Sequence, residues 1–73
     1  MRLVWAPDGM SSTFGGVYRI TLHDNQYELQ WLPPNGHYWQ RLAVEDDLMQ
    51  AKMSASIHAS LSDEDKGIVF TRA

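Results

Sequence analysis

The sequence predicts an α+β fold: a three-stranded antiparallel β-meander packed on one α-helix, with short N- and C-terminal strands that extend the sheet or pair beside it. Two observations predict the sheet. Apolar residues alternate with polar ones over 17–22 and 27–31, and Asp24-Asn25 between them favours a tight reversal. A third observation predicts the helix, because apolar residues recur every four positions over 49–61. We expect a single domain over residues 1–73.

The first hairpin is predicted together with its register. Asp and Asn both tolerate the left-handed backbone that a two-residue turn requires, so His23 should face Gln26 across the turn. Three cross-strand pairs then lie on one face: Leu22 with Tyr27, Ile20 with Leu29, and Tyr18 with Trp31. Because turn and apolar pattern agree, this face should carry the core.

The loop of the second hairpin, within W-L-P-P-N-G-H-Y-W (31–39), admits more than one length. A two-residue turn would require Pro34 to donate a hydrogen bond, which proline cannot do. A three-residue loop, 34–36, suits the turn chemistry but turns Leu42 and Val44 outward. A four-residue loop, 33–36, needs no proline donor, and we predict it. This register puts Tyr38, Gln40, Leu42 and Val44 on the apolar face, Trp39 on the other face, and Arg41 opposite Glu28.

The helix is predicted over about residues 46–61. The acidic run 45–47 supplies a cap and the charge that stabilises a helix N-terminus. The stripe expected to face the sheet is Met49, Met53, Ile57 and Leu61, widened by Leu48, Ala51, Ala55 and Ala59. The alternative is that the methionines line an adaptable binding groove. His58 falls on the predicted polar side and is assigned no role.

The ends of the chain are predicted from shorter signals. Leu3-Val4-Trp5 is expected to form a first strand, ended by the turn sequence 7–9. Residues 11–16 are expected to be a flexible connection. The β-prone run 68–71 is expected to form a last strand.

Composition excludes several classes of function. The chain has no cysteine, which excludes disulfides and thiolate metal sites, and its three histidines lie far apart. We therefore expect no metal and no cofactor. The net charge of −3 argues against direct nucleic-acid binding, whose affinity depends on neutralising phosphates. No apolar run reaches the roughly 18 residues of a membrane span, and the first apolar stretch is too short for a signal peptide. We expect a cytoplasmic protein.

The strongest candidate binding surface is the helix-free face of the predicted sheet. There Trp39 points away from the helix and is ringed by polar residues, a combination typical of interface hot spots. The alternative is that a terminal strand or a second copy covers Trp39. The predicted partner-binding residues are Trp39, Arg41, His37, Arg19, Glu28, Gln30 and Leu32. A secondary acidic surface is predicted at Asp46, Asp47, Asp63, Glu64 and Asp65.

No arrangement of residues predicts catalysis. Gly15-Gly16 precedes a strand instead of opening a helix, so it is not a phosphate-binding loop. The acidic clusters are explained by helix capping and solubility, and a chain this small has little room for a substrate pocket. We predict a non-enzymatic protein. Small domains with marginal cores often gain stability from a partner or from self-association.

Two stretches resemble the arm-binding domains of phage-type integrases, in which a three-stranded sheet packs on a helix. They are G-V-Y-R-I (16–20) and Y-W-Q-R-L-A-V (38–44), with the predicted helix soon after. Such domains read DNA with a basic sheet face, so the resemblance implies a nucleic-acid-binding module. In this sequence the basic residues of that face are Arg19 and Arg41, and Glu28 lies beside them.

In scale and style, the compact, cysteine-free, mildly acidic chain also resembles accessory proteins of phages and mobile elements, anti-CRISPR proteins among them. This resemblance implies a small inhibitor that binds and blocks a larger host protein or nucleoprotein complex without doing chemistry. The acidic groups would suit a basic nucleic-acid channel on the target. We take this as the leading hypothesis. The alternatives are the integrase-like nucleic-acid-binding module and a small homo-oligomeric structural protein, for instance a homodimer.

Overall fold

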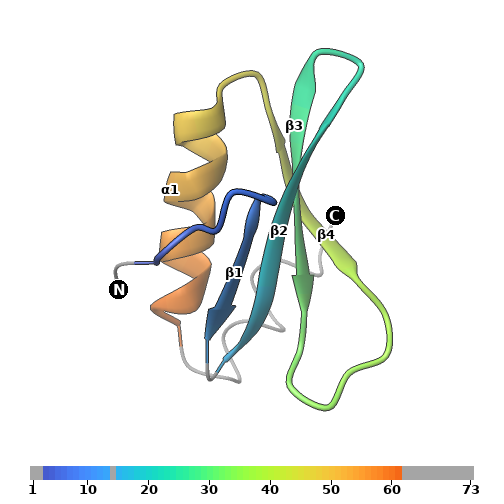
Figure 1. Ribbon diagram of the computed structural model, residues 1–73, viewed down its shortest axis with the longest axis vertical. Helices are drawn as coiled ribbons and strands as arrows, with labels where there is room; N and C mark the ends of the chain where they lie inside the picture. Colours follow the sequence, from blue (N-terminus) through green and yellow to red (C-terminus); the bar gives the residue numbers. More distant parts are fainter. Residues whose placement is uncertain (1–2, 14, 62–73) are drawn as a thin grey trace.

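A computed structural model of the chain describes residues 3–13 and 15–61. Within them, a four-stranded antiparallel sheet of order β1-β2-β3-β4 is covered on one face by a helix (Figure 1). The elements are β1 (Met10–Thr13), β2 (Gly16–His23), β3 (Gln26–Leu32), β4 (Gln40–Glu45) and α1 (Leu48–Ala59). The predicted α+β class is confirmed. The predicted meander corresponds to β2, β3 and β4, and β1 adds a fourth strand at its edge.

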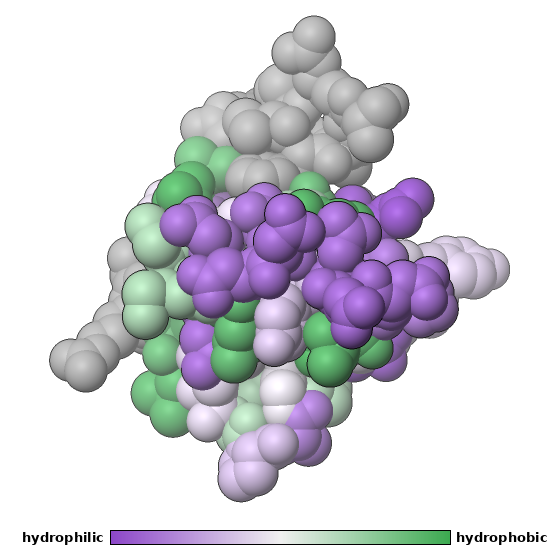
Figure 2. Space-filling view, turned by 90° about the horizontal axis from the view of Figure 1, so that it is seen from above, coloured by the Kyte–Doolittle hydropathy of each residue, from purple (hydrophilic) through white to green (hydrophobic). Residues whose placement is uncertain are grey.

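The β2–β3 hairpin has the predicted register. Asp24 and Asn25 both adopt positive φ, 53° and 63°, as a tight two-residue turn demands. His23 pairs with Gln26, and the pairs Leu22–Tyr27, Ile20–Leu29 and Tyr18–Trp31 follow along the strands. This turn lies at the end of the molecule that also carries the start of α1 (Figure 1), where hydrophilic side chains dominate the surface and hydrophobic ones appear beside them (Figure 2).

The predicted register of the second hairpin is wrong. Gln40 pairs with Trp31 and Arg41 with Gln30, after which a bulge shifts the ladder so that Ala43 faces Leu29. The predicted turn does close, since Gly36 N–H donates to the Pro33 carbonyl over 2.9 Å, but the chain rejoins β3 only at residue 40.

Two of the predicted apolar-face residues are therefore misplaced. Tyr38 stays in the loop and is 82% exposed. Val44 lies opposite Glu28 on the helix-free side, because the bulge reverses the parity of the strand at that point. Leu42 and Ala43 both pack against the core, and Gln40 lies on the Trp31 side as predicted.

A short N-terminal strand extends the sheet as predicted, but its predicted position at Leu3-Val4-Trp5 is wrong. β1 is formed by Met10 and by residues from the segment 11–16 that was expected to be a flexible connection, with Ser11 buried opposite Tyr18. Side-chain hydrogen bonds favour the reversal after β1: Thr13 Oγ1 donates to the Gly16 carbonyl over 2.9 Å and accepts from Gly15 N–H over 3.0 Å. Leu3 and Trp5 are not in a strand and instead pack against the edge of the core. The predicted strand at 68–71 lies outside the described residues.

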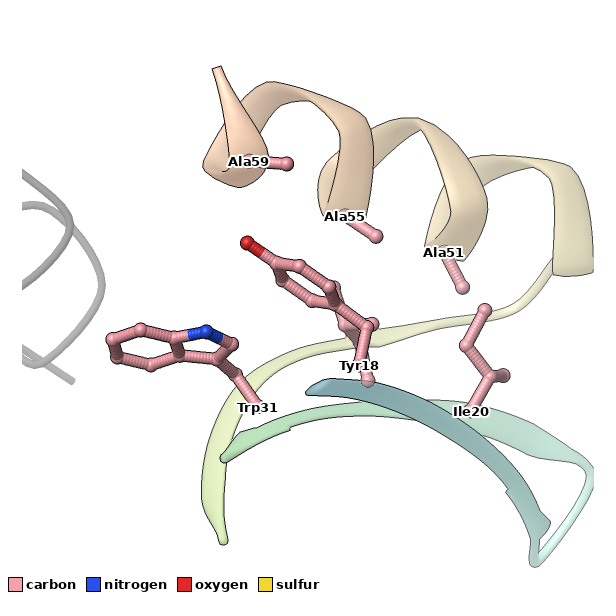
Figure 3. Close-up of a cluster of buried hydrophobic side chains, with 7 residues drawn as sticks. Tyr18, Ile20, Trp31, Ala51, Ala55 and Ala59 are labelled. Atoms are coloured by element: carbon pink, nitrogen blue, oxygen red, sulfur yellow. The ribbon is translucent and has the colours of Figure 1, made fainter. Parts of the chain in front are cut away.

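The core lies between the sheet and the alanine side of α1 (Figure 3). Its buried hydrophobic members are Tyr18, Ile20, Leu29 and Trp31 from the sheet and Ala51, Ala55 and Ala59 from the helix. Alanines on the facing side let the helix approach a sheet surface that already carries two large aromatic rings. Most of the core volume is filled from the sheet side, and the helix contributes small alanines together with the His58 ring.

The predicted sheet-facing stripe is confirmed for Ala51, Ala55 and Ala59 but wrong for its central residues. Met49, Met53 and Ile57 point outward and are 67%, 51% and 58% exposed. Leu48 is 38% exposed, and Leu61 lies beyond the end of α1, half-buried. His58, assigned to the polar side, is instead fully buried in the core.

Candidate interaction surfaces

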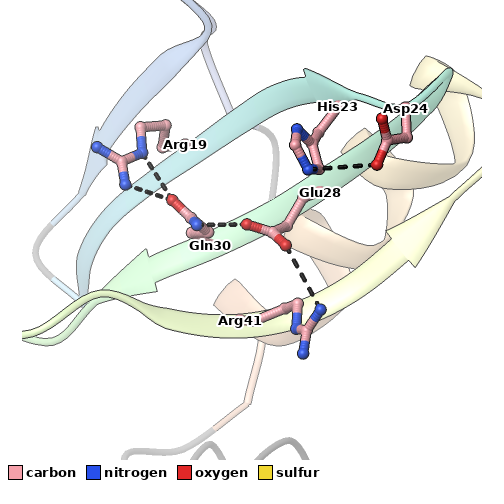
Figure 4. A network of polar contacts seen from close by, with 6 residues as sticks. All are labelled: Arg19, His23, Asp24, Glu28, Gln30 and Arg41. Carbon is pink, nitrogen blue, oxygen red and sulfur yellow. Dashed lines mark hydrogen bonds and ion pairs between the residues drawn. The ribbon is translucent and has the colours of Figure 1, made fainter.

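The helix-free face of the sheet carries a connected row of polar side chains from three strands (Figure 4). Register explains the row, because Arg19 lies directly opposite Gln30 and Gln30 directly opposite Arg41. Arg19 Nε donates to Gln30 Oε1 over 2.8 Å, and the Gln30 amide donates in turn to Glu28. Glu28 completes the row with an ion pair to Arg41, 3.6 Å between Oε1 and Nη1.

Trp39 lies at one end of this row, at the last position of the loop before β4. The guanidinium carbon of Arg19 lies 4.0 Å from the centroid of the Trp39 ring, a cation–π contact. Trp39 is half-buried on the helix-free face, whereas Trp31 is 7% exposed in the core. The two indoles thus have the opposite orientations that the sequence predicts, although the register used to predict them is wrong.

The remaining predicted residues of this surface lie at its margin. His37 is exposed in the 33–39 loop, and Leu32 is half-buried opposite Val17 at the end of β3. The structure therefore gathers Trp39, Arg19, Gln30, Glu28 and Arg41 into one network, here called the sheet-face network, and leaves His37 and Leu32 beside it.

The predicted acidic surface is only partly described. Asp47 caps the helix, with Oδ1 accepting from Met49 N–H over 3.4 Å, and Asp46 Oδ1 accepts from Gln26 Nε2 over 3.0 Å. Both are exposed and lie near the β2–β3 turn, where Asp24 pairs with His23. Asp63, Glu64 and Asp65 lie outside the described residues. Asp46 and Asp47 therefore have structural partners close by, Gln26 and the start of α1, and these partners account for their position.

A second surface, not among the predicted sites, is the outward face of α1. Next to it, the segment 3–9 and the helix enclose two hollows of about 420 and 330 Å³ that share Trp5 and Lys52 in their walls. The larger is lined by Leu3, Trp5, Met49, Lys52, Met53, Ser56 and Ile57. The sequence contained a signal for this surface: the alternative interpretation of Met49 and Met53 was that they line a binding groove and do not belong to the core.

The core contains one polar pair that the sequence interpretation missed. The Tyr18 hydroxyl and His58 Nδ1 lie 2.7 Å apart in a buried hydrogen bond, and the imidazole also packs edge-on against Trp31 at 4.6 Å between centroids. Burial raises the pKa of Tyr18 to about 12. The signal for His58 was its spacing: 51, 55 and 58 lie on one helical face once the alanines are taken as the buried side. The pair is inaccessible to a substrate and acts structurally.

Within residues 3–13 and 15–61, no group of three or more His, Asp or Glu side chains could hold a metal ion. Nor does any helix in that part of the chain have the length and apolar character needed to cross a membrane. Comparison of the chain with protein-family models, curated proteins and solved structures yields no match in any of the three.

Proposed function

We propose that this chain is a non-enzymatic protein-interaction module that binds and blocks a surface of a larger host protein or nucleoprotein complex, in the manner of small phage-encoded inhibitors. The observation that carries the proposal is the Trp39–Arg19 stack within the sheet-face network. Trp and Arg are the residue types most enriched at interface hot spots. Arg19 lies on the face of the sheet opposite to α1 (Figure 4), Trp39 stacks on it there, and both side chains keep part of their surface exposed.

The network also supports the proposal through the entropy of binding. A flexible arginine loses rotamer freedom when a partner fixes it, which costs about 0.5–1.5 kcal/mol per side chain. Arg19 is already held by Gln30 and by the Trp39 ring before any partner arrives. Arg41 is 66% exposed at its side chain, so donors remain available to a partner's carboxylate.

Interaction suits this surface better than catalysis. The side chains of the network contact one another along the strands, and none of them lines either of the two hollows beside α1. The group with a strongly raised pKa, Tyr18, is fully buried beneath the helix. A prearranged surface with an aromatic at one end is suited to shape-complementary docking.

Charge narrows the class of target. The whole chain carries −3, and Asp24, Asp46 and Asp47 are exposed together near the β2–β3 turn. The sheet-face network, in contrast, has two arginines and one glutamate. A target with a basic groove beside an acidic or aromatic patch would complement both regions, and long-range attraction would mainly raise the association rate.

The test begins with the tagged full-length chain as bait in a bacterial lysate, followed by titration of the purified retained protein. Trp39→Ala and Arg41→Glu should each weaken binding by about tenfold or more, while both variants keep the wild-type circular dichroism spectrum and remain folded at the assay temperature. Thr21→Ala, an exposed change on the same face outside the network, is the matched control and should bind normally. Normal binding by both network variants would contradict the proposal.

A nucleic-acid mobility assay separates the integrase-like alternative. Because Glu28 pairs with Arg41 and Gln30 engages Arg19, this face offers little net positive charge to a phosphate backbone. We expect no shift of DNA or RNA at low salt. A strongly salt-dependent shift that Arg41→Glu abolishes would favour direct nucleic-acid binding instead.

A further inference from the structure

The outward face of α1 forms a continuous apolar row. Met49, Met53 and Ile57 follow one another every four residues, and each exposes more than half of its surface. The larger hollow beside this row adds Leu3 and Trp5 to the apolar surface. We propose that this surface, here called the helix seam, is the interface of a two-fold symmetric dimer of the chain. The proposal concerns the face opposite to the sheet-face network and stands or falls independently of it.

The first argument is the character of the helix itself. A surface helix of a globular protein normally has one apolar side, which faces the core, and a polar side that faces solvent. In α1 the alanine side faces the sheet, yet the seam on the opposite side is apolar too, and the polar residues Gln50, Lys52, Ser54 and Ser56 lie between the two sides. One side is covered by the chain's own sheet. The composition of the other side indicates that it is covered as well.

The second argument selects a copy of the same chain as the occupant. Residues at i, i+4 and i+8 form one of the ridges by which helices pack, and two such ridges interdigitate in the commonest crossing class, near −50°. Met49, Met53 and Ile57 are a ridge of this kind. A second copy rotated about an axis near Met53 presents the identical ridge in the opposite direction. A two-fold interface is self-complementary by definition.

The third argument is electrostatic. Two acidic copies repel unless the surfaces that meet are free of acidic groups, and α1 contains none. Its single Lys or Arg residue is Lys52, on the flank that faces Trp5. The stem of Lys52 lines the hollow, and such a stem can stay apolar while its ammonium reaches solvent. The negative charges at residues 46 and 47 lie at the helix start, away from Met53 at the centre of the seam.

The fourth argument is the size of the interface that the chain can supply. A standard interface takes about 800 Å² from each partner, which is about 15% of this chain's 5189 Å² surface. The seam supplies three side chains that are each more than half exposed, and Leu3, Trp5 and Ser56 beside it widen the patch toward that size, while Lys52 is the only charged residue beside it on α1. The small core would also gain stability from such an interface, because three of its seven buried hydrophobic residues are alanines, which bury little area.

The test is the oligomeric state of the full-length chain, measured by sedimentation equilibrium over about a hundredfold range of concentration. The wild type should form a dimer. Met53→Glu places a carboxylate at the centre of the seam and should weaken the dimer at least about a hundredfold, whereas Met53→Leu should preserve it. Thr21→Glu adds the same charge to the opposite face of the molecule and should leave the dimer intact. Met53 is half exposed, so Met53→Glu should keep the wild-type circular dichroism spectrum.

Three results would overturn the proposal. They are a wild type that stays monomeric throughout the range, an assembly other than a dimer, and a dimer that Met53→Glu and Thr21→Glu affect equally. The absence of cysteine allows a second measurement on the same question. A spin label attached through Met53→Cys should report a short distance between copies, and one attached through Thr21→Cys should report a long one. The reverse order of distances would place the interface on the sheet.

Discussion

Tyr18 and His58, forty positions apart in the chain, meet inside the core through a hydrogen bond of 2.7 Å between the phenol hydroxyl and imidazole Nδ1. Both side chains are fully buried, and their rings pack edge to face. The bond fastens the middle of the sheet to the last turn of α1. A buried polar pair is stable only while both partners are present, since the loss of one leaves the other unsatisfied in an apolar environment.

His58→Ala should therefore lower the free energy of unfolding by about 2–4 kcal/mol, because it opens a cavity and strands the Tyr18 hydroxyl. Urea unfolding followed by circular dichroism measures the loss. Gln50→Ala, an exposed change in the same helix, should stay within about 0.5 kcal/mol of wild type. Equal stability of the two variants would show that the pair contributes nothing.

Stability should fall as the pH rises above about 10. The pKa of Tyr18 is 10.0 in the unfolded chain and about 12 in the fold, so between these values the unfolded state has lost a proton that the folded state retains. The contribution of the protonated Tyr18 hydroxyl to the free energy of unfolding is fully present below pH 10 and disappears as the pH approaches 12. At most it amounts to about 3 kcal/mol. Urea unfolding at several alkaline pH values measures it, and Tyr18→Phe should flatten the profile over the same range.

Trp31 and Trp39 should differ sharply in their contribution to stability. Trp31 is 7% exposed and donates its indole N–H to the Gly15 carbonyl over 2.9 Å, so Trp31→Phe should cost about 1–3 kcal/mol. Trp39 is half-buried beneath Arg19, and Trp39→Phe keeps a ring there at a cost of about 0.5 kcal/mol or less. Thermal unfolding of the matched variants compares them. A larger loss for Trp39 would mean that the sheet-face network is a structural core.

Gly16 should tolerate no side chain. Its φ is 119°, and a Cβ there would collide with the Leu32 carbonyl and the Trp31 indole nitrogen. Gly16→Ala should cost about 2–5 kcal/mol through strain and overpacking. Gly36→Ala lies in the 33–39 loop, where the tight neighbour is Pro33 and the chain is outside the ladder. Its loss in chemical denaturation should be clearly smaller, and the opposite ranking would contradict this explanation.

Much of the fold could be predicted because the relevant information is local. The β2–β3 hairpin depends on two turn residues and on alternation within short strands, and both are visible in the sequence. The α+β class follows from the change of apolar period from two to four. The outward orientation of Arg19, Glu28 and Gln30 follows from the same alternation, so most of the sheet-face network could be assembled before the structure.

The errors have a common cause, which is that competing arrangements satisfied the same local rules. The seam residues and the alanines of α1 both recur with helical spacing, so periodicity alone did not determine which side faces the sheet. The 33–39 loop and the bulge opposite the Leu29–Gln30 step changed the pairing of β4 without breaking any turn rule. β1 formed from a Ser–Thr segment of modest apolar character because β2 offered a free edge.

The sequence by itself determined β2, β3, β4 and α1, the β2–β3 register and the inward orientation of Trp31, since backbone sterics and side-chain alternation act over a few residues. Only the tertiary structure decided the rotation of the helix. Tyr18 and Trp31 already fill the space above the sheet, so the small alanines and His58 fit against them, and the bulky methionines are left outside. That choice depends on volumes contributed by segments distant in sequence, and no periodicity within the helix encodes it.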